Sequence, residues 1–341
     1  MRILIVKMSS LGDVIHTLPA LTDAYKHYPH ISWDWVVEEA FSEIPLWHPA
    51  IERVIPIALR RWRHHIWRTW SQGHWQQFRH HLQAHAYDRI IDAQGLLKSA
   101  WITFQARGQR YGFDSASARE PLATLGYHQR YRIAPQQHAV ERIRQLFAAI
   151  LDYSFTELPL DYGINDRFQG INQHSPPIIV FLIGSTWITK LWPQSHWLAL
   201  AARVIQAGYA IRLPWGNEAE YQRAQEIAAV HPQIELIPKS NLETLAYILV
   251  QAQAIVGVDS GLAHLAAALK RPTVTLYAAT EPRFTGTYAN QQCHLQADFP
   301  CAPCFNKTCR YRRLTDPPCY TQLSVEKVWL ALQSMFSAPL S

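Results

Sequence analysis

Short, continuous apolar runs alternate with longer amphipathic stretches in the first half of the chain. Such runs are typical of strands that are buried on both faces, because they lack a polar alternation. Three strands are predicted, at residues 2–8, 32–39 and 89–94. Helices are predicted at residues 13–29, 96–107 and 138–151. The last of these shows apolar residues every three or four positions, which indicates one buried helix face.

The pattern breaks at residues 162–177, a polar stretch that ends in Pro176–Pro177, and then restarts. Strands are predicted at residues 178–184, 210–216, 234–238, 254–259 and 273–278. Helices are predicted at residues 195–208, 219–232, 241–252 and 261–270, with a last one at residues 324–336. This alternation indicates an α/β fold with parallel sheets covered by helices on both faces.

We therefore expect two Rossmann-like, doubly wound domains that face each other across a cleft. Residues 1–165 would form the first domain and residues 176–323 the second. Ligands of such sheets lie outside the carboxyl ends of the strands. The residues that directly follow predicted strands are therefore the candidates for chemistry.

Length and composition agree with this division. The 341 residues are 48% hydrophobic, which is enough for two cores. No uncharged apolar run reaches the roughly 18 residues of a membrane-spanning helix. The N-terminal "MRILIVKMSS" has a short apolar part, charge returns at Lys7, and no small-residue cleavage site follows. We interpret it as a first strand and not as a signal peptide, and expect a cytoplasmic protein.

The net charge of +6 is modest, but basic residues concentrate in one segment. Between Arg53 and Tyr87 there is no Asp or Glu. The segment carries six His, and its Arg and Trp residues are Arg53, Arg60, Arg61, Arg63, Arg68, Arg79, Trp62, Trp67, Trp70 and Trp75. Because Arg binds phosphate and Trp favours the water–lipid boundary, this segment predicts an anionic, phosphate-bearing partner at a membrane surface. A merely solvated basic face is the alternative. No nucleic-acid-binding pattern is present.

The loop "KMSSLGDVIH" (7–16) follows the first predicted strand and leads into a helix at Asp13. Loop amides and a helix N-terminus favour anions. A carboxylate there is placed to accept a proton from a substrate hydroxyl. The structural alternative is that Asp13 only caps the helix. Neither G-x-G-x-x-G nor G-x-x-x-x-G-K-[ST] occurs here, so the loop does not match a known nucleotide-binding motif.

Three strand ends of the second domain carry similar chemistry. They are "GSTWITK" with Ser185, Thr186 and Lys190, "GNEAE" with Glu220, and "VDSGLAHL" with Asp259, Ser260, Gly261 and His264. Small hydroxyls, exposed amides and a lysine suit phosphate oxygens, and carboxylates suit sugar hydroxyls. Singly, Glu220 could be a cap and His264 a packed core residue. Three such corners on one sheet are better explained by a ligand.

Four of the five cysteines lie in a Pro-rich, basic tail, at Cys301, Cys304, Cys309 and Cys319. A C-x-x-C pair can hold zinc, and four thiols could complete a tetrahedral site. The later pair is not a second C-x-x-C, so plain reduced thiols are the alternative. Disulfides are not expected in the cytoplasm.

Taken together, several segments resemble the bacterial lipopolysaccharide heptosyltransferases of glycosyltransferase family 9, most of all the heptosyltransferase I branch. The segments are "KMSSLGDVIHTLPALTDA", "WVVEEAF", "IDAQGLLKSA", "AREPLA", "HAVER", "LPWG" and "VDSGLAHLAAAL", and the resemblance covers roughly residues 1–290. It implies a GT-B fold and an inverting, metal-independent transfer of L-glycero-D-manno-heptose from ADP-heptose to the first Kdo of Kdo2-lipid A. It also implies that the protein acts at the cytoplasmic face of the inner membrane. It further implies that a last helix, at residues 324–338, packs on the first domain.

The resemblance implies roles for individual residues. Asp13 corresponds to the catalytic base, and Lys190 also to a catalytic contact. The donor contacts implied are Ser185, Thr186, Lys190, Glu220, Asp259, Ser260, Gly261 and His264. The acceptor contacts implied are Ser9, Ser10, Arg60, Arg61, Arg63 and Arg119. Ser185 and Ser260 stand where the family more often has Thr.

The chain has no Asp-x-Asp, which agrees with a metal-free diphosphate. One feature leaves the acceptor open, because the cysteine tail is more similar to that of heptosyltransferase II and related family members. A heptosyltransferase II-like enzyme that acts on a heptosylated core is therefore one alternative. A non-catalytic lipopolysaccharide-binding module is another, from a different class of function.

Overall fold

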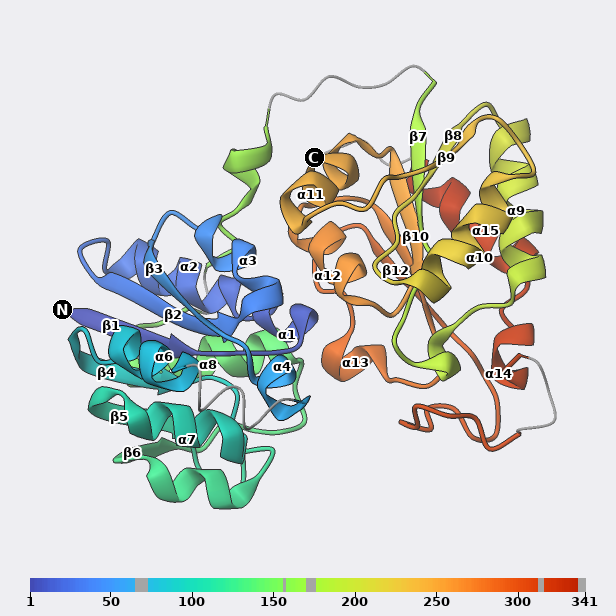
Figure 1. The fold of residues 1–341 in the computed structure, drawn as a ribbon. Helices are drawn as coiled ribbons and strands as arrows, with labels where there is room; N and C mark the ends of the chain where they lie inside the picture. Colours follow the sequence, from blue (N-terminus) through green and yellow to red (C-terminus); the bar gives the residue numbers. More distant parts are fainter. Residues whose placement is uncertain (65–72, 156–157, 170–175, 312–315, 337–341) are drawn as a thin grey trace. The chain divides into compact units, whose positions relative to one another are not determined.

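The computed structural model describes residues 1–341 except 65–72, 156–157, 170–175, 312–315 and 337–341. The chain divides into two compact units, Met1–Ile164 and Asn165–Ser341 (Figure 1). The predicted polar boundary at 162–177 contains this division. Its short turn at Asn165–Phe168 belongs to the second unit, where the Asn165 side chain donates to the Ala268 carbonyl.

The first unit is a parallel six-stranded sheet in the order β3-β2-β1-β4-β5-β6. Its strands are β1 (Arg2–Val6), β2 (Ser32–Glu38), β3 (Ile51–Ile57), β4 (Ala86–Asp92), β5 (Arg107–Phe113) and β6 (Gln129–Tyr131). Its α-helices are α1 (Leu11–Ile15), α2 (Leu18–His27), α3 (Glu43–Leu46), α4 (Leu59–His64), α6 (His74–Leu82), α7 (Leu97–Gln105) and α8 (Ala139–Leu151). Short 3₁₀ turns are η1 (Glu39–Phe41) and η2 (Pro121–Gly126).

The second unit repeats this topology, with the sheet order β12-β11-β10-β7-β8-β9 and every pairing parallel. Its strands are β7 (Ile178–Leu182), β8 (Ala210–Leu213), β9 (Ile234–Leu236), β10 (Ala254–Val258), β11 (Thr273–Tyr277) and β12 (Gln292–Gln296). Its helices are α9 (Gln194–Gln206), α10 (Glu218–Ala228), α11 (Leu242–Gln251), α12 (Gly261–Ala268), α13 (Pro282–Thr285), α14 (Pro318–Thr321) and α15 (Val325–Phe336). Two 3₁₀ turns, η3 (Asn165–Phe168) and η4 (Ile188–Lys190), complete it.

The predicted α/β class is confirmed: both units are doubly wound sheets of the Rossmann type. The central strands are apolar because helices cover both faces, and β1, β7, β10 and β11 are buried along nearly their whole length. No helix within the described ranges is both long and apolar enough to cross a bilayer.

Several elements differ from the prediction. The single helix expected at 13–29 is two helices, because the chain turns at Thr17 and a new helix begins at Leu18, with Pro19 in its first turn. The edge strands β3, β6 and β12 were not predicted, nor was β5 beside β6. These strands are only partly buried, so they show no continuous apolar run.

The terminal helix also lies elsewhere than expected. We expected residues 324–338 to join the first domain, but Val328 and Leu332 of α15 are buried in the core of the second unit. That core includes Phe181 of β7 and Val204 of α9. The apolar face of α15 covers one side of the second sheet. Residues 337–338 of the predicted helix lie outside the described residues.

Candidate functional site

The strand order reverses at one place in each sheet, between β1 and β4 in the first unit and between β7 and β10 in the second. Loops that leave the two central strands diverge there, which creates the usual ligand position of a doubly wound sheet. The predicted residues Asp13, Lys190 and Asp259 all follow these central strands. The two reversal points are described separately below.

Asp13 lies in the first turn of α1, directly after the β1 loop. Its Oδ2 accepts hydrogen bonds from the Ser10 backbone N–H at 2.9 Å and from the Ser10 hydroxyl at 3.0 Å. The capping alternative therefore holds in part, because these bonds stabilise the start of α1. The other oxygen, Oδ1, lies 4.0 Å from Lys7 Nζ, and the side chain keeps 24% of its surface exposed. Asp13 thus both caps a helix and presents a carboxylate oxygen.

Lys7 is a buried ammonium at the reversal point of the first sheet. Its Nζ donates to the Ala93 carbonyl, after β4, at 3.0 Å. Burial lowers the pKa of Lys7, while the neighbouring Asp13 carboxylate opposes that shift. For Asp13, burial acts to raise the pKa, but Lys7, the Ser10 bonds and Arg119 together hold it below its ordinary value. Asp13 is therefore ionised at neutral pH.

Three further residues surround this corner. Arg119 is exposed, as expected for an acceptor contact, and its charge acts on both Lys7 and Asp13. Arg142 of α8 stacks over the Phe113 ring at 5.1 Å and is electrostatically coupled to Arg119. Gln94 accepts from the Met8 N–H at 2.8 Å, and its buried amide nitrogen has no partner within the described ranges. Sequence reasoning missed Lys7, Arg142 and Gln94 as site residues.

The predicted acceptor residues of the first unit do not all converge. Ser9 accepts from Lys98 Nζ at 3.1 Å and Ser10 is occupied with Asp13, so both lie at this corner. Arg60, Arg61 and Arg63 belong to α4, which follows the edge strand β3.

The strand-end carboxylates Glu38 and Glu39 partly balance the charge of α4. The Arg60 N–H donates to Glu38 at 3.0 Å, and Arg61 forms an exposed ion pair with Glu39 at 2.9 Å. The positive charge of the basic segment is therefore partly neutralised by carboxylates that lie outside the segment in the sequence. Arg68, Trp67 and Trp70 lie outside the described residues.

At the second reversal point, the lysine and the aspartate are closer together than Lys7 and Asp13 are at the first. Lys190 Nζ lies 2.6 Å from Asp259 Oδ2, and the Thr280 hydroxyl donates to the same oxygen at 2.6 Å. His264 Nε2 lies 3.6 Å from Asp259 Oδ1. Asp259 and His264 are buried, with exposures of 6% and 7%. Burial acts to raise the pKa of Asp259, but His264 and Lys190 hold it well below its ordinary value. His264 is therefore a packed residue that lies beside Asp259, and its contact with a donor stays a prediction.

Ser260 and Gly261 begin α12 beside this group. Ser260 is the N-cap residue, yet its side chain makes no capping bond. Its buried hydroxyl has no hydrogen-bond partner among the described residues. A buried hydroxyl without a hydrogen-bond partner destabilises the fold unless a ligand or a water molecule supplies that partner. Together with the amides of the first turn, it forms a place for an anion or a sugar hydroxyl.

Glu220 reaches the end of β7 from α10. Its Oε2 accepts from the Gly216 N–H at 2.8 Å. A Cβ at Gly184 would lie 2.4 Å from the Glu220 carboxyl carbon, so the glycine is what lets this carboxylate approach the strand end. Ser185 accepts from the Trp187 N–H at 3.3 Å, and Thr186 is exposed. All predicted donor contacts of the second unit therefore lie in segments that directly follow the carboxyl ends of strands.

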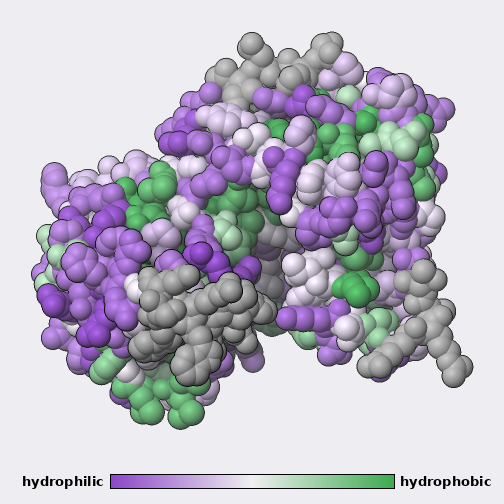
Figure 2. All heavy atoms as spheres, in the orientation of Figure 1, coloured by the Kyte–Doolittle hydropathy of each residue, from purple (hydrophilic) through white to green (hydrophobic). Residues whose placement is uncertain are grey.

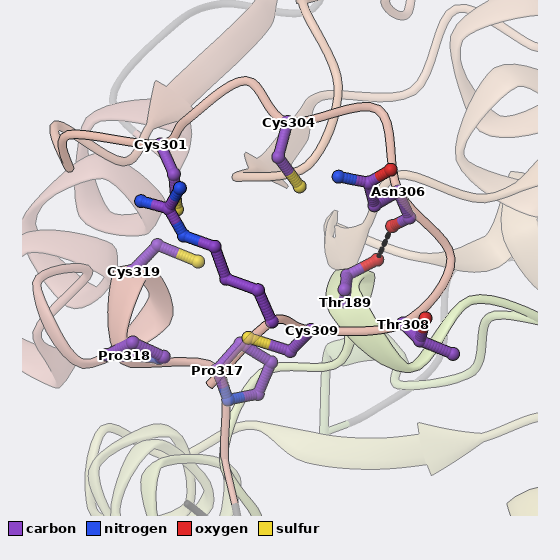
Figure 3. Close-up of a pocket in the computed structure, with 10 residues that line it drawn as sticks. Thr189, Cys301, Cys304, Asn306, Thr308, Cys309, Pro317, Pro318 and Cys319 are labelled. Carbon is purple, nitrogen blue, oxygen red and sulfur yellow. Dashed lines mark hydrogen bonds between the residues drawn. The ribbon is translucent and has the colours of Figure 1, made fainter. Parts of the chain in front are cut away.

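The cysteine tail lies against the turn that carries Lys190, because Thr189 of that turn lines the same pocket as the cysteines. Cys301, Cys304, Cys309 and Cys319 line one pocket of about 280 Å³ (Figure 3), and all are free thiols. Within the described part of the chain, no three His, Cys, Asp or Glu side chains converge as a metal site requires. Burial, with the neighbouring thiols, raises the pKa of Cys319 to about 11, so this group is a thiol and not a thiolate at neutral pH.

The tail also supports the turn that carries Lys190, a role that the sequence did not reveal. The Thr189 hydroxyl donates to the Asn306 carbonyl. The ammonium groups of Lys190 and Lys307 lie 4.6 Å and 5.9 Å from the centre of the Trp187 ring. These contacts hold the turn that carries Lys190.

Comparisons with known proteins give a consistent result. The model of glycosyltransferase family 9 (heptosyltransferase) matches residues 75–315. The chain is 50% identical to lipopolysaccharide heptosyltransferase 1 of Pseudomonas aeruginosa, over 99% of each chain. The solved structure of E. coli heptosyltransferase WaaC with ADP matches with a TM-score of 0.88 at 43% identity, over 98% of this chain and 100% of that one. WaaC with ADP-2-deoxy-2-fluoro heptose matches with a TM-score of 0.85 at 43% identity, over 98% and 99%.

The buried ion pair makes a testable contribution to stability. We expect Asp259→Asn to lower the free energy of unfolding at neutral pH by about 3 kcal/mol, because Lys190 would lose the carboxylate that compensates its burial. Since the pKa of Asp259 is lower in the folded state, this contribution is lost as the pH falls below its unfolded value of about 3.9. Urea unfolding at neutral and acidic pH measures both effects.

The matched control is Glu235→Gln, which breaks an exposed pair with Arg212 in the same unit. It should cost less than about 1 kcal/mol. Equal losses in the two variants would contradict a special role for the buried pair.

Proposed function

The chain belongs to glycosyltransferase family 9, the heptosyltransferases, and we propose that it moves L-glycero-D-manno-heptose from ADP-heptose to the first Kdo of Kdo2-lipid A. It is a glycosyltransferase of lipopolysaccharide inner-core synthesis. The observation that carries the proposed donor is the buried Lys190–Asp259–His264 group at a strand reversal. The WaaC relative was solved with ADP and with a fluorinated ADP-heptose, which supports the same donor here.

The second unit supplies the donor contacts in this proposal. Lys190, with the Ser185 and Thr186 hydroxyls, binds the diphosphate, and Glu220 accepts hydrogen bonds from the ribose. Asp259 holds the Lys190 ammonium in place at 2.6 Å, and its pairing with His264 orients the imidazole toward the donor. Ser260 and the amides from Gly261 onward contact the sugar and the near phosphate.

As the bond to the heptose breaks, negative charge grows on ADP. Lys190 and the first-turn amides of α12 stabilise that charge because they are already in position. A metal ion is not part of this proposal. The chain has no Asp-x-Asp to hold one against a diphosphate.

The first unit supplies the base. The acceptor hydroxyl of Kdo attacks the anomeric carbon of the heptose from the face opposite ADP, so the configuration inverts. The proton passes to Asp13, whose Oδ1 is not used by Ser10. Lys7 keeps this carboxylate ionised. Its low pKa suffices, because the proton becomes acidic once the alcohol oxygen begins to bond to an electron-poor carbon. Arg119 and the arginines of α4 bind the acidic groups and phosphates of the acceptor.

We place the enzyme at the cytoplasmic face of the inner membrane, where a lipid-anchored acceptor is reached. An assay for ADP release with purified protein separates this proposal from its alternatives. Kdo2-lipid A should be turned over, and the same acceptor that already carries one heptose should not. Release with the heptosylated acceptor alone would favour a heptosyltransferase II-like enzyme. No release with either acceptor would favour a binding module.

We predict that Asp13→Asn lowers kcat by about a thousandfold, because no other carboxylate is proposed to take the proton. Binding of ADP, measured by titration calorimetry, should persist, because the donor contacts lie in the other unit. The matched control is Asp88→Asn, at the opposite end of the first sheet, which should leave kcat within about twofold of the parent value. Unchanged turnover in Asp13→Asn would remove Asp13 from its role.

We predict that the triple variant Arg60→Gln, Arg61→Gln, Arg63→Gln raises the acceptor KM by about tenfold or more, through lost phosphate contacts. The donor KM should change by less than about twofold, since the donor contacts lie in the second unit. Steady-state kinetics with each substrate varied in turn measures both values. Equal changes in the two KM values would mean that α4 is only a solvated basic face. Arg203→Gln with Arg212→Gln, on the second unit, controls for net charge.

A further inference from the structure

Helix α7 presents an apolar stripe to solvent. Leu97, Trp101 and Phe104 have 51%, 48% and 60% of their surface exposed. Their spacing of four and three residues places them on one face of the helix. The opposite face, with Ile102 and Thr103, is completely buried against the sheet. The helix therefore has apolar residues on both faces, which its role in the fold does not require.

The turn η2 extends this stripe into a surface. Leu122 and Leu125 are exposed by 66% and 72%. The small residues Ala100 and Ala123 pack together with Tyr127, which brings η2 against α7. Figure 2 shows hydrophobic side chains at the lower edge of the first unit, where α7 and η2 lie in Figure 1. We call the set Leu97, Trp101, Phe104, Leu122 and Leu125 the α7–η2 face.

The charges around this face are almost all positive. No Asp or Glu occurs between Asp92 and Asp114, or between Glu120 and Glu141. The lysine and arginine residues on these two stretches are Lys98, Arg107, Arg110, Arg130 and Arg132. Glu120 is occupied by the Leu97 N–H at the start of α7. Trp101 also stacks on Trp75 of α6, with ring centres 4.5 Å apart, which joins the face to the basic segment.

The face begins beside the proposed base. Lys98, next to Leu97 on the first turn of α7, donates to Ser9 at 3.1 Å. Ser10, the next residue, donates to Asp13. The start of α7 and the carboxylate therefore belong to one hydrogen-bonded corner of the first unit.

We propose that the α7–η2 face inserts into the headgroup region of an anionic bilayer and so presents Asp13 to a lipid-anchored acceptor. This inference rests on the proposed function for its acceptor, but membrane binding can be measured without it. Exposed leucines and aromatic rings with flanking cations match the chemistry of an anionic membrane surface. A symmetric self-association would instead place the basic rims of two copies against each other.

The first experiment measures co-sedimentation of the full chain with phosphatidylethanolamine vesicles that contain phosphatidylglycerol. We expect the variant Phe104→Ser, Leu122→Ser, Leu125→Ser to bind these vesicles at least about tenfold more weakly than the parent. These side chains are exposed, so the fold should be kept, and circular dichroism with thermal unfolding verifies this. The matched control is Leu46→Ser, Val230→Ser, Leu330→Ser, whose side chains are exposed by 53%, 57% and 57% outside the face.

The control variant should bind vesicles like the parent. Equal loss in the two variants, or unchanged binding in the face variant, would overturn the proposal. Unchanged vesicle binding together with a loss of self-association in sedimentation velocity would assign the face to a second copy of the chain. Parent binding that is as strong to phosphatidylcholine vesicles as to anionic ones would overturn the role of the basic rim.

A second experiment links the face to turnover. With Kdo2-lipid A in vesicles, the face variant should raise the acceptor KM by about tenfold. With a deacylated, water-soluble form of the acceptor, its kcat/KM should stay within about twofold of the parent value. Equal losses on both acceptors would overturn the proposal. If the parent turns over neither acceptor, the proposed function fails, whereas the vesicle result still decides the membrane face.

Discussion

The pairing of a lysine with an aspartate at each strand reversal is the interaction on which both parts of the candidate site depend. A doubly wound sheet leaves space where its two central strands send their loops in opposite directions. Lys7 and Asp13 occupy that space in the first unit, and Lys190 and Asp259 occupy it in the second. Each lysine compensates a carboxylate that burial alone would tend to protonate.

The two pairs differ in ways that suit different tasks. Lys190 and Asp259 are in contact at 2.6 Å. Thr280 donates to the same carboxylate and His264 lies beside its other oxygen, so this group is a rigid charged support. Lys7 and Asp13 are 4.0 Å apart, and Lys7 is bonded instead to the Ala93 carbonyl. Asp13 is therefore kept ionised without having its second oxygen occupied by the lysine. The same pair of residue types thus forms a structural support in the second unit and the proposed proton acceptor in the first.

The chemistry of the first unit continues into its surface. The bonds from Asp13 through Ser10, and from Ser9 to Lys98, connect the β1 loop with the start of α7. From there the α7–η2 face carries apolar side chains outward. In the proposed function the acceptor sugar is attached to a lipid and reaches the proposed base only near the bilayer, so that proposal requires the base and a membrane-facing surface to be close on the molecule. The small residues Ala100 and Ala123 make this possible by letting α7 and η2 pack closely.

Local patterns in the sequence determined the central strands, the main helices and the residues that follow them. Apolar runs and strand-end loops are properties of neighbouring residues, so Asp13, Glu220 and Asp259 could be found from them. The edge strands β3, β6 and β12, the Lys190–Asp259 pair across 69 residues and the approach of Glu38 and Glu39 to α4 were decided only by the tertiary structure. The same holds for α15, whose apolar face fits either unit by pattern but packs on the second sheet. Pairing and burial depend on which distant segments meet, and periodicity along the chain does not contain that information.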